Sequence, residues 1–168
     1  MRDIIVCDLD GTLCNIDHRL HFVQYVNKPV EGVPLDCNER PRKDWDSFFA
    51  GVPNDTVNKP VLEVLDRFRL ASDDFQIVFC SGRPERCRAD TVEWLKKYYF
   101  TEREGKLHYE LYMRQDGDFR RDDIVKQEIL DKYLDKDRVL FVLDDRDQVV
   151  DMWRRNGLTC FQVAEGDF

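Results

Sequence analysis

The sequence has little of what several classes of protein require. No apolar run is long enough to cross a membrane, and the run Ile4–Cys7 near the start is too short for a secretory signal. Internal repeats and low-complexity tracts are also absent from the sequence. We therefore expect one cytoplasmic globular domain over residues 1–168, because a chain of this length buries a core without disulfides or metals.

The sequence also lacks paired cysteine motifs. The six cysteines form no Cys-x-x-Cys pair, and Cys7 and Cys80 lie inside apolar, strand-like runs where a small buried residue fits. We expect reduced thiols rather than disulfides, as in other cytoplasmic proteins. The nearest approach to a zinc site has a spacing that matches no standard one, so ordinary packing and surface roles are favoured. It consists of Cys14, His18, His21 and Cys37.

The sequence also lacks an excess of positive charge. The net charge is −8 and the isoelectric point is about 4.9, which argues against a broad basic face that holds nucleic acid along its length. Clustered carboxylates are, however, the ligands that a hard divalent cation needs, and such a cation favours the binding of phosphate. The acidity is therefore compatible with a small, phosphate-terminated target.

Short apolar runs alternate with helical patterns along most of the chain. The helical patterns carry apolar residues at three- and four-residue spacing. This alternation predicts an α/β fold, a Rossmann-like parallel five-stranded sheet flanked by helices, with ligands at the carboxyl ends of the strands. The predicted strands are Asp3–Leu9, Phe75–Cys80, Tyr109–Met113, Val139–Leu143 and Thr159–Val163, and the predicted helices are Pro60–Leu70, Glu85–Tyr99, Asp122–Leu134 and Arg146–Asn156.

Residues 14–59 interrupt the alternation. This segment is rich in Pro, Asn and Arg, and its one aromatic cluster lies in Lys43–Phe49. We interpret it as a small cap inserted after the first strand. The cluster either stacks on a nucleobase or, as is more usual in a short insertion, forms the cap's own small core. Its aromatic residues are Trp45, Phe48 and Phe49.

The first predicted strand leads into Asp8-Leu9-Asp10-Gly11-Thr12. Two carboxylates one residue apart on an extended strand lie on the same side, and the glycine lets the chain turn sharply. We predict that Asp8 is a nucleophile and that Asp10 protonates the leaving oxygen and then activates water. Asp-x-Asp alone is more often an acidic turn, so the motif gains its weight from a second acidic pair downstream.

That second pair is Asp144-Asp145, which follows the run Val139–Leu143. In a parallel sheet it emerges at the same edge as Asp8, where the two acidic pairs repel each other unless a cation lies between them. We predict a magnesium ion held by Asp8, Asp144 and the backbone carbonyl of Asp10, with Asp145 acting through water. Alone, an Asp-Asp pair could equally be a helix N-cap with a surface charge.

Ser81-Gly82-Arg83 and Lys126 complete the candidate site. The tripeptide follows a predicted strand and precedes a predicted helix, and it offers a hydroxyl, a backbone amide and a cation to a phosphate. Taken by itself, the tripeptide is more often an ordinary turn. Lys126 lies in a predicted helix, where a lysine is normally solvated, so its candidacy depends on the other motifs.

Taken in the order in which they occur along the chain, the four motifs resemble those of the haloacid dehalogenase-like phosphatases. Longer strings are similar to the 3′-phosphatase half of phage-type polynucleotide kinase-phosphatases, and they are much more specific than the short motifs. The resemblance covers nearly the whole chain. The strings are Arg114–Asp118, Arg121–Lys126, Asp144–Arg155 and Phe161–Phe168.

The resemblance implies a role for each matching position. Arg19 is matched only by its distance after Asp8. The implied catalytic residues are Asp8, Asp10 and Lys126. The implied metal ligands are Asp8, Asp10, Asp144 and Asp145. The residues implied in binding phosphate or substrate are Thr12, Arg19, Ser81, Gly82, Arg83, Arg114 and Asp122.

For the whole chain, the resemblance implies a magnesium-dependent phosphatase with an aspartyl-phosphate intermediate. Its expected substrates are 3′-phosphates on DNA or RNA ends, or 3′-nucleotides, in nucleic-acid end repair. One alternative is a phosphatase of small metabolites or 5′-nucleotides, which would share the catalytic residues and differ around the cap. A non-enzymatic end-binding module is the other, although it would need neither a nucleophile nor a proton shuttle.

The sequence has no Gly-x-x-x-x-Gly-Lys-Ser/Thr loop, so we expect no kinase activity from this chain. Association with a separate kinase domain and assembly into a homo-oligomer stay open. The preference between DNA and RNA and the natural length of the substrate stay open as well.

Overall fold

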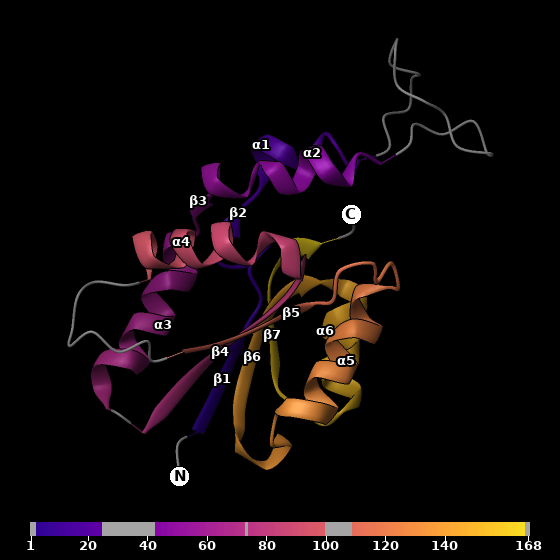
Figure 1. Ribbon diagram of the computed structural model, residues 1–168. Coiled ribbons are helices and arrows are strands. Elements are labelled where there is room, and N and C mark those ends of the chain that lie inside the picture. The colour runs from indigo at the N-terminus through magenta and orange to yellow at the C-terminus, as the bar shows by residue number, and fades with distance from the viewer. Residues whose placement is uncertain (1–2, 25–42, 73, 100–108, 167–168) are drawn as a thin grey trace.

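A five-stranded parallel sheet forms the centre of the protein (Figure 1). The computed structural model describes residues 3–24, 43–72, 74–99 and 109–166. The strand order is β5-β4-β1-β6-β7, which confirms the predicted α/β fold with a parallel five-stranded sheet. The strands are β1 (Asp3–Cys7), β4 (Phe75–Pro84), β5 (Tyr109–Arg114), β6 (Val139–Arg146) and β7 (Cys160–Gly166).

Four helices cover the two faces of the sheet (Figure 1). Ile5 and Cys7 of β1 pack with the helices on one face, and Ile4 and Val6 pack with those on the other. Both faces of β1 are therefore buried, which is why a central parallel strand reads as a continuous apolar run. The first pair of helices is α3 (Lys59–Ala71) and α4 (Arg88–Tyr98), and the second is α5 (Asp122–Tyr133) and α6 (Asp147–Arg155).

The position of β1 determines where its carboxyl end lies. Cys7 pairs with Phe79 of β4 on one side and with Leu143 of β6 on the other. Asp8 therefore leaves the sheet between the two strands that lead to Ser81 and Asp144. This is the edge at which α/β sheets bind ligands.

One local prediction was wrong at the end of β4. The sequence predicts that the strand ends at Cys80 and that Ser81–Arg83 forms a turn, but β4 continues to Pro84. The pairing of β4 with β5 shifts its register between Ser81 and Pro84, and this irregularity keeps the segment in the strand. A 3-10 turn, η2 (Glu85–Cys87), then leads into α4, which begins three residues later than predicted.

The described part of segment 14–59 lies over the carboxyl ends of the strands (Figure 1). β2 (Cys14–Asn15) and β3 (Thr56–Val57) pair in antiparallel fashion, so the two ends of the insertion meet at its base. Between them lie α1 (Asp17–Leu20), α2 (Trp45–Ala50) and the 3-10 turn η1 (Val52–Asn54). We refer to this part as the cap. The assignment of residues 1–168 to a single domain stays a prediction.

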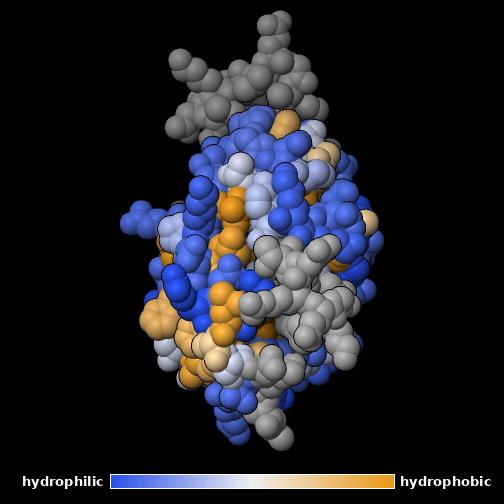
Figure 2. All heavy atoms as spheres, turned by 90° about the vertical axis from the view of Figure 1, so that its left-hand side faces the viewer, coloured by the Kyte–Doolittle hydropathy of each residue, from blue (hydrophilic) through white to orange (hydrophobic). Residues whose placement is uncertain are grey.

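The surface on the α3 side is mostly hydrophilic, with a narrow stripe of hydrophobic residues (Figure 2). No helix in the described ranges is long and apolar enough to cross a membrane. The described cysteines are buried free thiols, whereas Cys37 lies outside the described residues. They are Cys7, Cys14, Cys80, Cys87 and Cys160.

Candidate active site

Three carboxylates converge where β1 and β6 end. Oxygen atoms of Asp8, Asp144 and Asp145 all lie within 4.8 Å of one another, and all three residues are buried. The backbone amide of Asp8 donates to the carbonyl of Leu143 at 2.9 Å, which ties the two strand ends together. Trp153 of α6 donates from Nε1 to Asp144 Oδ2 at 3.1 Å. Asp8 of the first acidic pair therefore meets both members of the second, as the topology predicted from the sequence requires, whereas Asp10 lies in a separate cluster.

Lys126 of α5 lies between two of these carboxylates. Its Nζ is 2.7 Å from Asp8 Oδ1 and 2.9 Å from Asp144 Oδ2, and the residue is only 1% exposed. Burial lowers the pKa of a lysine, but Asp144 and Asp8 outweigh it and hold the pKa of Lys126 well above its ordinary value. Lys126 is thus a fixed internal cation rather than a solvated surface lysine.

The acidic cluster retains more negative charge than Lys126 can balance. Burial raises the pKa of Asp8 well above its ordinary value, with Lys126 opposing the shift and Asp144 adding to it. Burial and then the charge of Asp144 raise the pKa of Asp145 to about 6. A divalent cation would relieve this repulsion, and a set of carboxylate oxygens is the donor chemistry that magnesium prefers. The residues present therefore fit a magnesium site.

The hydroxyl groups of Thr12 and Ser81 are both directed at protein groups. Thr12 Oγ1 donates to Asp145 Oδ1 at 3.0 Å, and the backbone amide of Arg83 donates to Ser81 Oγ at 3.2 Å. Gly11 has a φ of +87°, and a Cβ at this position would collide with the carboxylate of Asp145. The turn after β1 therefore needs glycine, and Thr12 orients Asp145.

Two arginines hold Asp10. Arg19 Nη2 donates to Asp10 Oδ1 at 2.7 Å, and Arg83 donates to the same oxygen from Nε at 2.8 Å and also from Nη2. Burial raises the pKa of Asp10, but Arg83 and Arg19 outweigh it and lower the pKa to about 2. Phosphate binding by Arg19 and Arg83 stays a prediction, since both guanidinium groups face carboxylates here.

Asp55 holds both arginines and is the residue that the sequence analysis missed. Its carboxylate accepts from Arg19 Nε and Nη2 and from Arg83 Nη2, each at 2.7 Å. Its backbone carbonyl accepts from Trp94 Nε1 at 2.7 Å, and the residue is 1% exposed. Asp55 thus orients, through the arginines, the side chain of Asp10. A single aspartate in a polar segment carries no signal in the sequence, and only the pairing of β2 with β3 brings it here.

Arg114 links β5 to the phosphate-binding candidates. It donates from Nε to the carbonyl of Gly82 at 2.8 Å and from Nη2 to Asp122 Oδ1 at 3.0 Å. Asp122 Oδ2 in turn lies 3.7 Å from Lys126 Nζ and from Arg146 Nη1. A Cβ on Gly82 would collide with the carboxylate of Asp122, so this close approach requires glycine.

The zinc alternative has no support in the described residues. Among them, Cys14 gathers with Asp10 and Asp55 rather than with His18 and His21. The guanidinium groups of two arginines already neutralise that cluster. Cys37, the fourth member of the zinc set considered from the sequence, lies outside the described residues.

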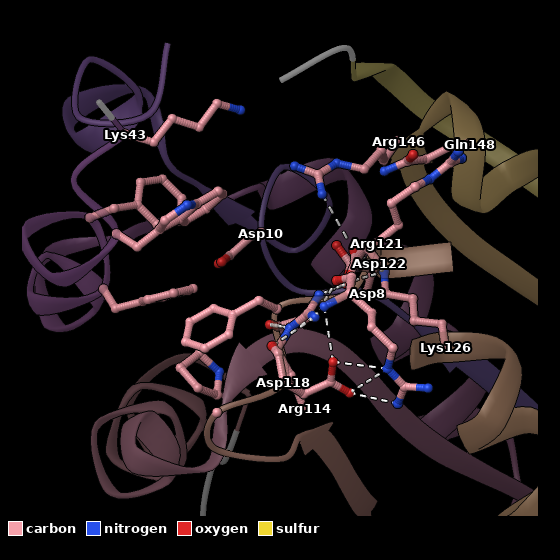
Figure 3. A pocket seen from close by; sticks show the side chains of 18 of the residues that line it. Asp8, Asp10, Lys43, Arg114, Asp118, Arg121, Asp122, Lys126, Arg146 and Gln148 are labelled. Atoms are coloured by element: carbon pink, nitrogen blue, oxygen red, sulfur yellow. Dashed lines mark hydrogen bonds and ion pairs between the residues drawn. The ribbon is translucent and has the colours of Figure 1, made fainter. Parts of the chain in front are cut away.

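A cavity of about 350 Å³ opens between the cap and the acidic cluster. Asp8 and Asp10 reach it from the segment after β1 and Lys126 from α5, and Lys43 of the cap lies across from them (Figure 3). Its volume lies in the range of small-molecule sites. Aromatic residues of the cap supply the opposite wall, namely Trp45, Phe48 and Phe49.

The family follows from the comparison with known proteins. Residues 30–168 match the model of the phosphatase domain of polynucleotide kinase PNKP. The chain belongs to this phosphatase family. The match begins after Asp8 and Asp10, but the structural comparisons described next span 99% of the chain and so include them. The predicted enzyme class and the resemblance seen in the sequence are both confirmed.

Similar proteins are much longer than this chain. A protein of Autographa californica nuclear polyhedrosis virus, named for bifunctional polynucleotide kinase and RNA ligase activities, is 28% identical over 89% of the chain and 17% of its own length. Two structures of a Pnkp1/Rnl/Hen1 complex, one titled as an RNA repair complex, contain chains 31% and 32% identical to it. Their TM-scores are 0.71 and 0.69, and the match covers 99% of this chain and 44% and 48% of theirs.

A haloacid dehalogenase-like hydrolase from Streptococcus pneumoniae shares the fold at 15% identity. Its TM-score is 0.61, and the match covers 96% of this chain and 84% of that one. The chain therefore has a haloacid dehalogenase-like fold, and it spans less than half the length of the repair proteins that it resembles more closely in sequence.

Proposed function

We propose that this phosphatase removes 3′-phosphates from nucleic-acid ends or 3′-nucleotides, with magnesium as its cofactor and an aspartyl-phosphate on Asp8 as its intermediate. The observation that carries the proposal is the buried arrangement of Asp8, Lys126 and Asp144, which opens into the cavity under the cap. A nucleophile beside a fixed cation and a set of metal-binding oxygens is what phosphoryl transfer requires.

In the first step an oxygen of Asp8 attacks phosphorus. The new bond joins Asp8 to the phosphoryl group, and the bond from phosphorus to the 3′-oxygen breaks. Asp10 gives its proton to that oxygen, which leaves as a hydroxyl. Because Arg19 and Arg83 hold Asp10 ionised, the substrate phosphate binds as its monoanion and passes its proton to Asp10, whose pKa is raised by the negative charge of the phosphate beside it.

In the second step water hydrolyses the aspartyl-phosphate. Asp10, again a carboxylate, removes a proton from the water as it attacks phosphorus. The bond between Asp8 and the phosphoryl group breaks, which frees inorganic phosphate and regenerates Asp8. The pKa of about 2 keeps Asp10 ionised before the attack, and the negative charge of the phosphoryl group on Asp8 makes Asp10 basic enough to take the proton, which then leaves with the inorganic phosphate.

Charge compensation comes from Lys126 and from the metal ligands. Lys126 donates to Asp8 and Asp144 and stays protonated throughout. A magnesium ion held by Asp8, Asp144 and the carbonyl of Asp10, with Asp145 acting through water, would supply further positive charge to the transferring phosphate. Thr12 keeps the carboxylate of Asp145 in place.

The choice of a 3′-phosphate and of nucleic acid as substrate is supported by family membership. The names of the longer relatives, which refer to polynucleotide kinase, RNA ligase and RNA repair, support the further proposal that this domain acts beside a kinase. The net charge of the chain also limits how much of a nucleic-acid strand it contacts. Because the chain carries −8, we propose that it binds the terminal nucleotide and little of the strand beyond it.

The test compares thymidine 3′-phosphate with thymidine 5′-phosphate, each with magnesium and with EDTA. The proposal predicts magnesium-dependent release of phosphate mainly from the 3′-ester. Purified Asp8→Asn protein is the matched control, because an amide preserves the shape and removes the nucleophile. Equal or faster hydrolysis of the 5′-ester would favour the nucleotidase alternative, and turnover by Asp8→Asn would refute the covalent mechanism.

A further inference from the structure

Two exposed aromatic side chains from distant parts of the sequence border the catalytic cavity. Trp45 lies on α2 of the cap and is 38% exposed, and Phe119 lies between β5 and α5 and is 91% exposed. Both line the same cavity as Asp8 and Asp10. Single exposed aromatics are common on proteins, but two on the wall of one cavity indicate a surface that binds a ligand.

Trp45 is held in place by its aromatic neighbours. Its ring stacks on Phe49, with centroids 5.8 Å apart and planes at 23°, and meets the edge of the buried Phe48 ring at 5.6 Å. Asp44 caps α2 by accepting from the backbone amide of Ser47 at 3.0 Å. Binding a ligand against Trp45 therefore costs little side-chain entropy, because the ring is already held in place.

Arg114 holds the backbone on either side of Phe119. Arg114 Nη1 donates to the carbonyls of Asp118 and Arg120, the residues on either side of Phe119, at 3.2 and 2.6 Å. The same guanidinium group donates to Asp122 and, through Nε, to Gly82 in the catalytic site. The position of Phe119 is therefore tied directly to the groups around the phosphate.

Charge around the cavity differs from that of the chain. Seven basic and five acidic side chains line it, whereas the whole chain carries a net charge of −8. The locally positive wall suits an anionic sugar-phosphate next to the aromatic rings. The basic residues are Lys43, Arg86, Arg114, Arg120, Arg121, Lys126 and Arg146.

We propose that Trp45 and Phe119 form a binding site for one nucleobase, that of the nucleotide whose phosphate is removed. This inference rests on the proposed function, since it places the base beside a phosphate bound at Asp8. Every base presents a π face, so the site takes all four bases with similar strength. It also explains how an acidic protein recognises a nucleic-acid end. Contacts to one base and to the terminal phosphate take the place of contacts along an extended basic groove.

The kinetic test measures wild type, Trp45→Ala and Phe119→Ala on thymidine 3′-phosphate and on glycerol 2-phosphate, a monoester without a base. Stacking of one base predicts that each variant raises KM for the nucleotide by roughly tenfold. Hydrolysis of glycerol 2-phosphate should be unchanged. Phe161→Ala is the matched control, because Phe161 is a half-exposed aromatic on β7 outside the cavity. Equal losses on both substrates, or no change on either, would overturn the proposal.

Binding separates this inference from the proposed function. In the Asp8→Asn protein, calorimetry should show tighter binding of thymidine 3′-phosphate than of glycerol 2-phosphate, and Trp45→Ala or Phe119→Ala should remove the difference. If wild type binds the nucleotide in this way but does not hydrolyse it, the 3′-phosphatase proposal fails and the base site stands. If the variants bind the nucleotide as tightly as their parent, the base site is refuted whatever the catalytic result.

Discussion

Replacing Asp55 by asparagine tests the buried network that controls Asp10. The change keeps the shape of the side chain but removes the charge that faces Arg19 and Arg83, whose three hydrogen bonds to Asp55 are each 2.7 Å long. Removing one partner of a buried ion pair typically costs about 3–5 kcal/mol. Domains have about 5–15 kcal/mol of stability, so the variant should fold with a clearly lower urea midpoint.

The effect on catalysis should depend on the leaving group. Without the charge of Asp55, the two arginines act on Asp10 alone and lower its pKa further, so a smaller fraction of Asp10 carries the proton that the leaving oxygen needs. General acid–base catalysis contributes roughly 10²–10⁴-fold, and we expect Asp55→Asn to lose about 10- to 100-fold of it on thymidine 3′-phosphate. p-Nitrophenyl phosphate, whose leaving group needs no proton, should lose much less.

Asp66→Asn is the control for both measurements, because Asp66 pairs with Arg69 in a partly exposed ion pair on α3. It should change neither the activity nor the preference between the two substrates. Equal losses of Asp55→Asn on thymidine 3′-phosphate and p-nitrophenyl phosphate would show that Asp55 supports only the fold. An unchanged rate on both substrates would refute the positioning role altogether.

Three further changes test other parts of the site. Asp10→Asn should lower kcat on thymidine 3′-phosphate by roughly 10²–10⁴-fold and lower kcat on p-nitrophenyl phosphate far less. Steady-state kinetics on the two esters measure both losses, and equal losses would mean that another group donates the proton. Activity should vanish in EDTA and return with magnesium, and Asp144→Asn should need more magnesium for half its maximal rate; a titration identical to that of wild type would remove Asp144 from the ligand set. Gly82→Ala should lower activity because its Cβ displaces Asp122, and a fully active variant would show that this carboxylate is not needed.

The fold and the meeting of Asp8 with Asp144 could be predicted because each depends on local patterns. The apolar run of β1 reflects helices on both faces of the sheet, and the parallel topology places Asp8 and Asp144 at one edge. The end of β4 could not be predicted in this way. Its extension past Cys80 depends on an irregular pairing with β5, and a strand shows no local signal for the register of its neighbour.

The groups that orient the candidate catalytic residues were less predictable than the positions of those residues. Asp55 matters because β2 and β3 bring it to Arg19 and Arg83, and a tertiary arrangement of this kind leaves no periodic pattern. The aromatic cluster of the cap was predicted only as two alternatives. In the structure Phe48 is buried, as in a small core, while Trp45 stays partly exposed at the cavity.

The environments of Asp8 and Asp10 account for their different proposed roles. Asp8 lies with two other carboxylates and one lysine, so its surroundings favour a cation and then a phosphate. Asp10 lies with two arginines, which hold it ionised until the bound substrate phosphate brings a proton and adds negative charge nearby. Two aspartates one residue apart thus occupy opposite electrostatic fields. Substrate binding is then the event that makes Asp10 an acid. The departing inorganic phosphate carries away the proton that Asp10 took from water, and this restores the resting carboxylate.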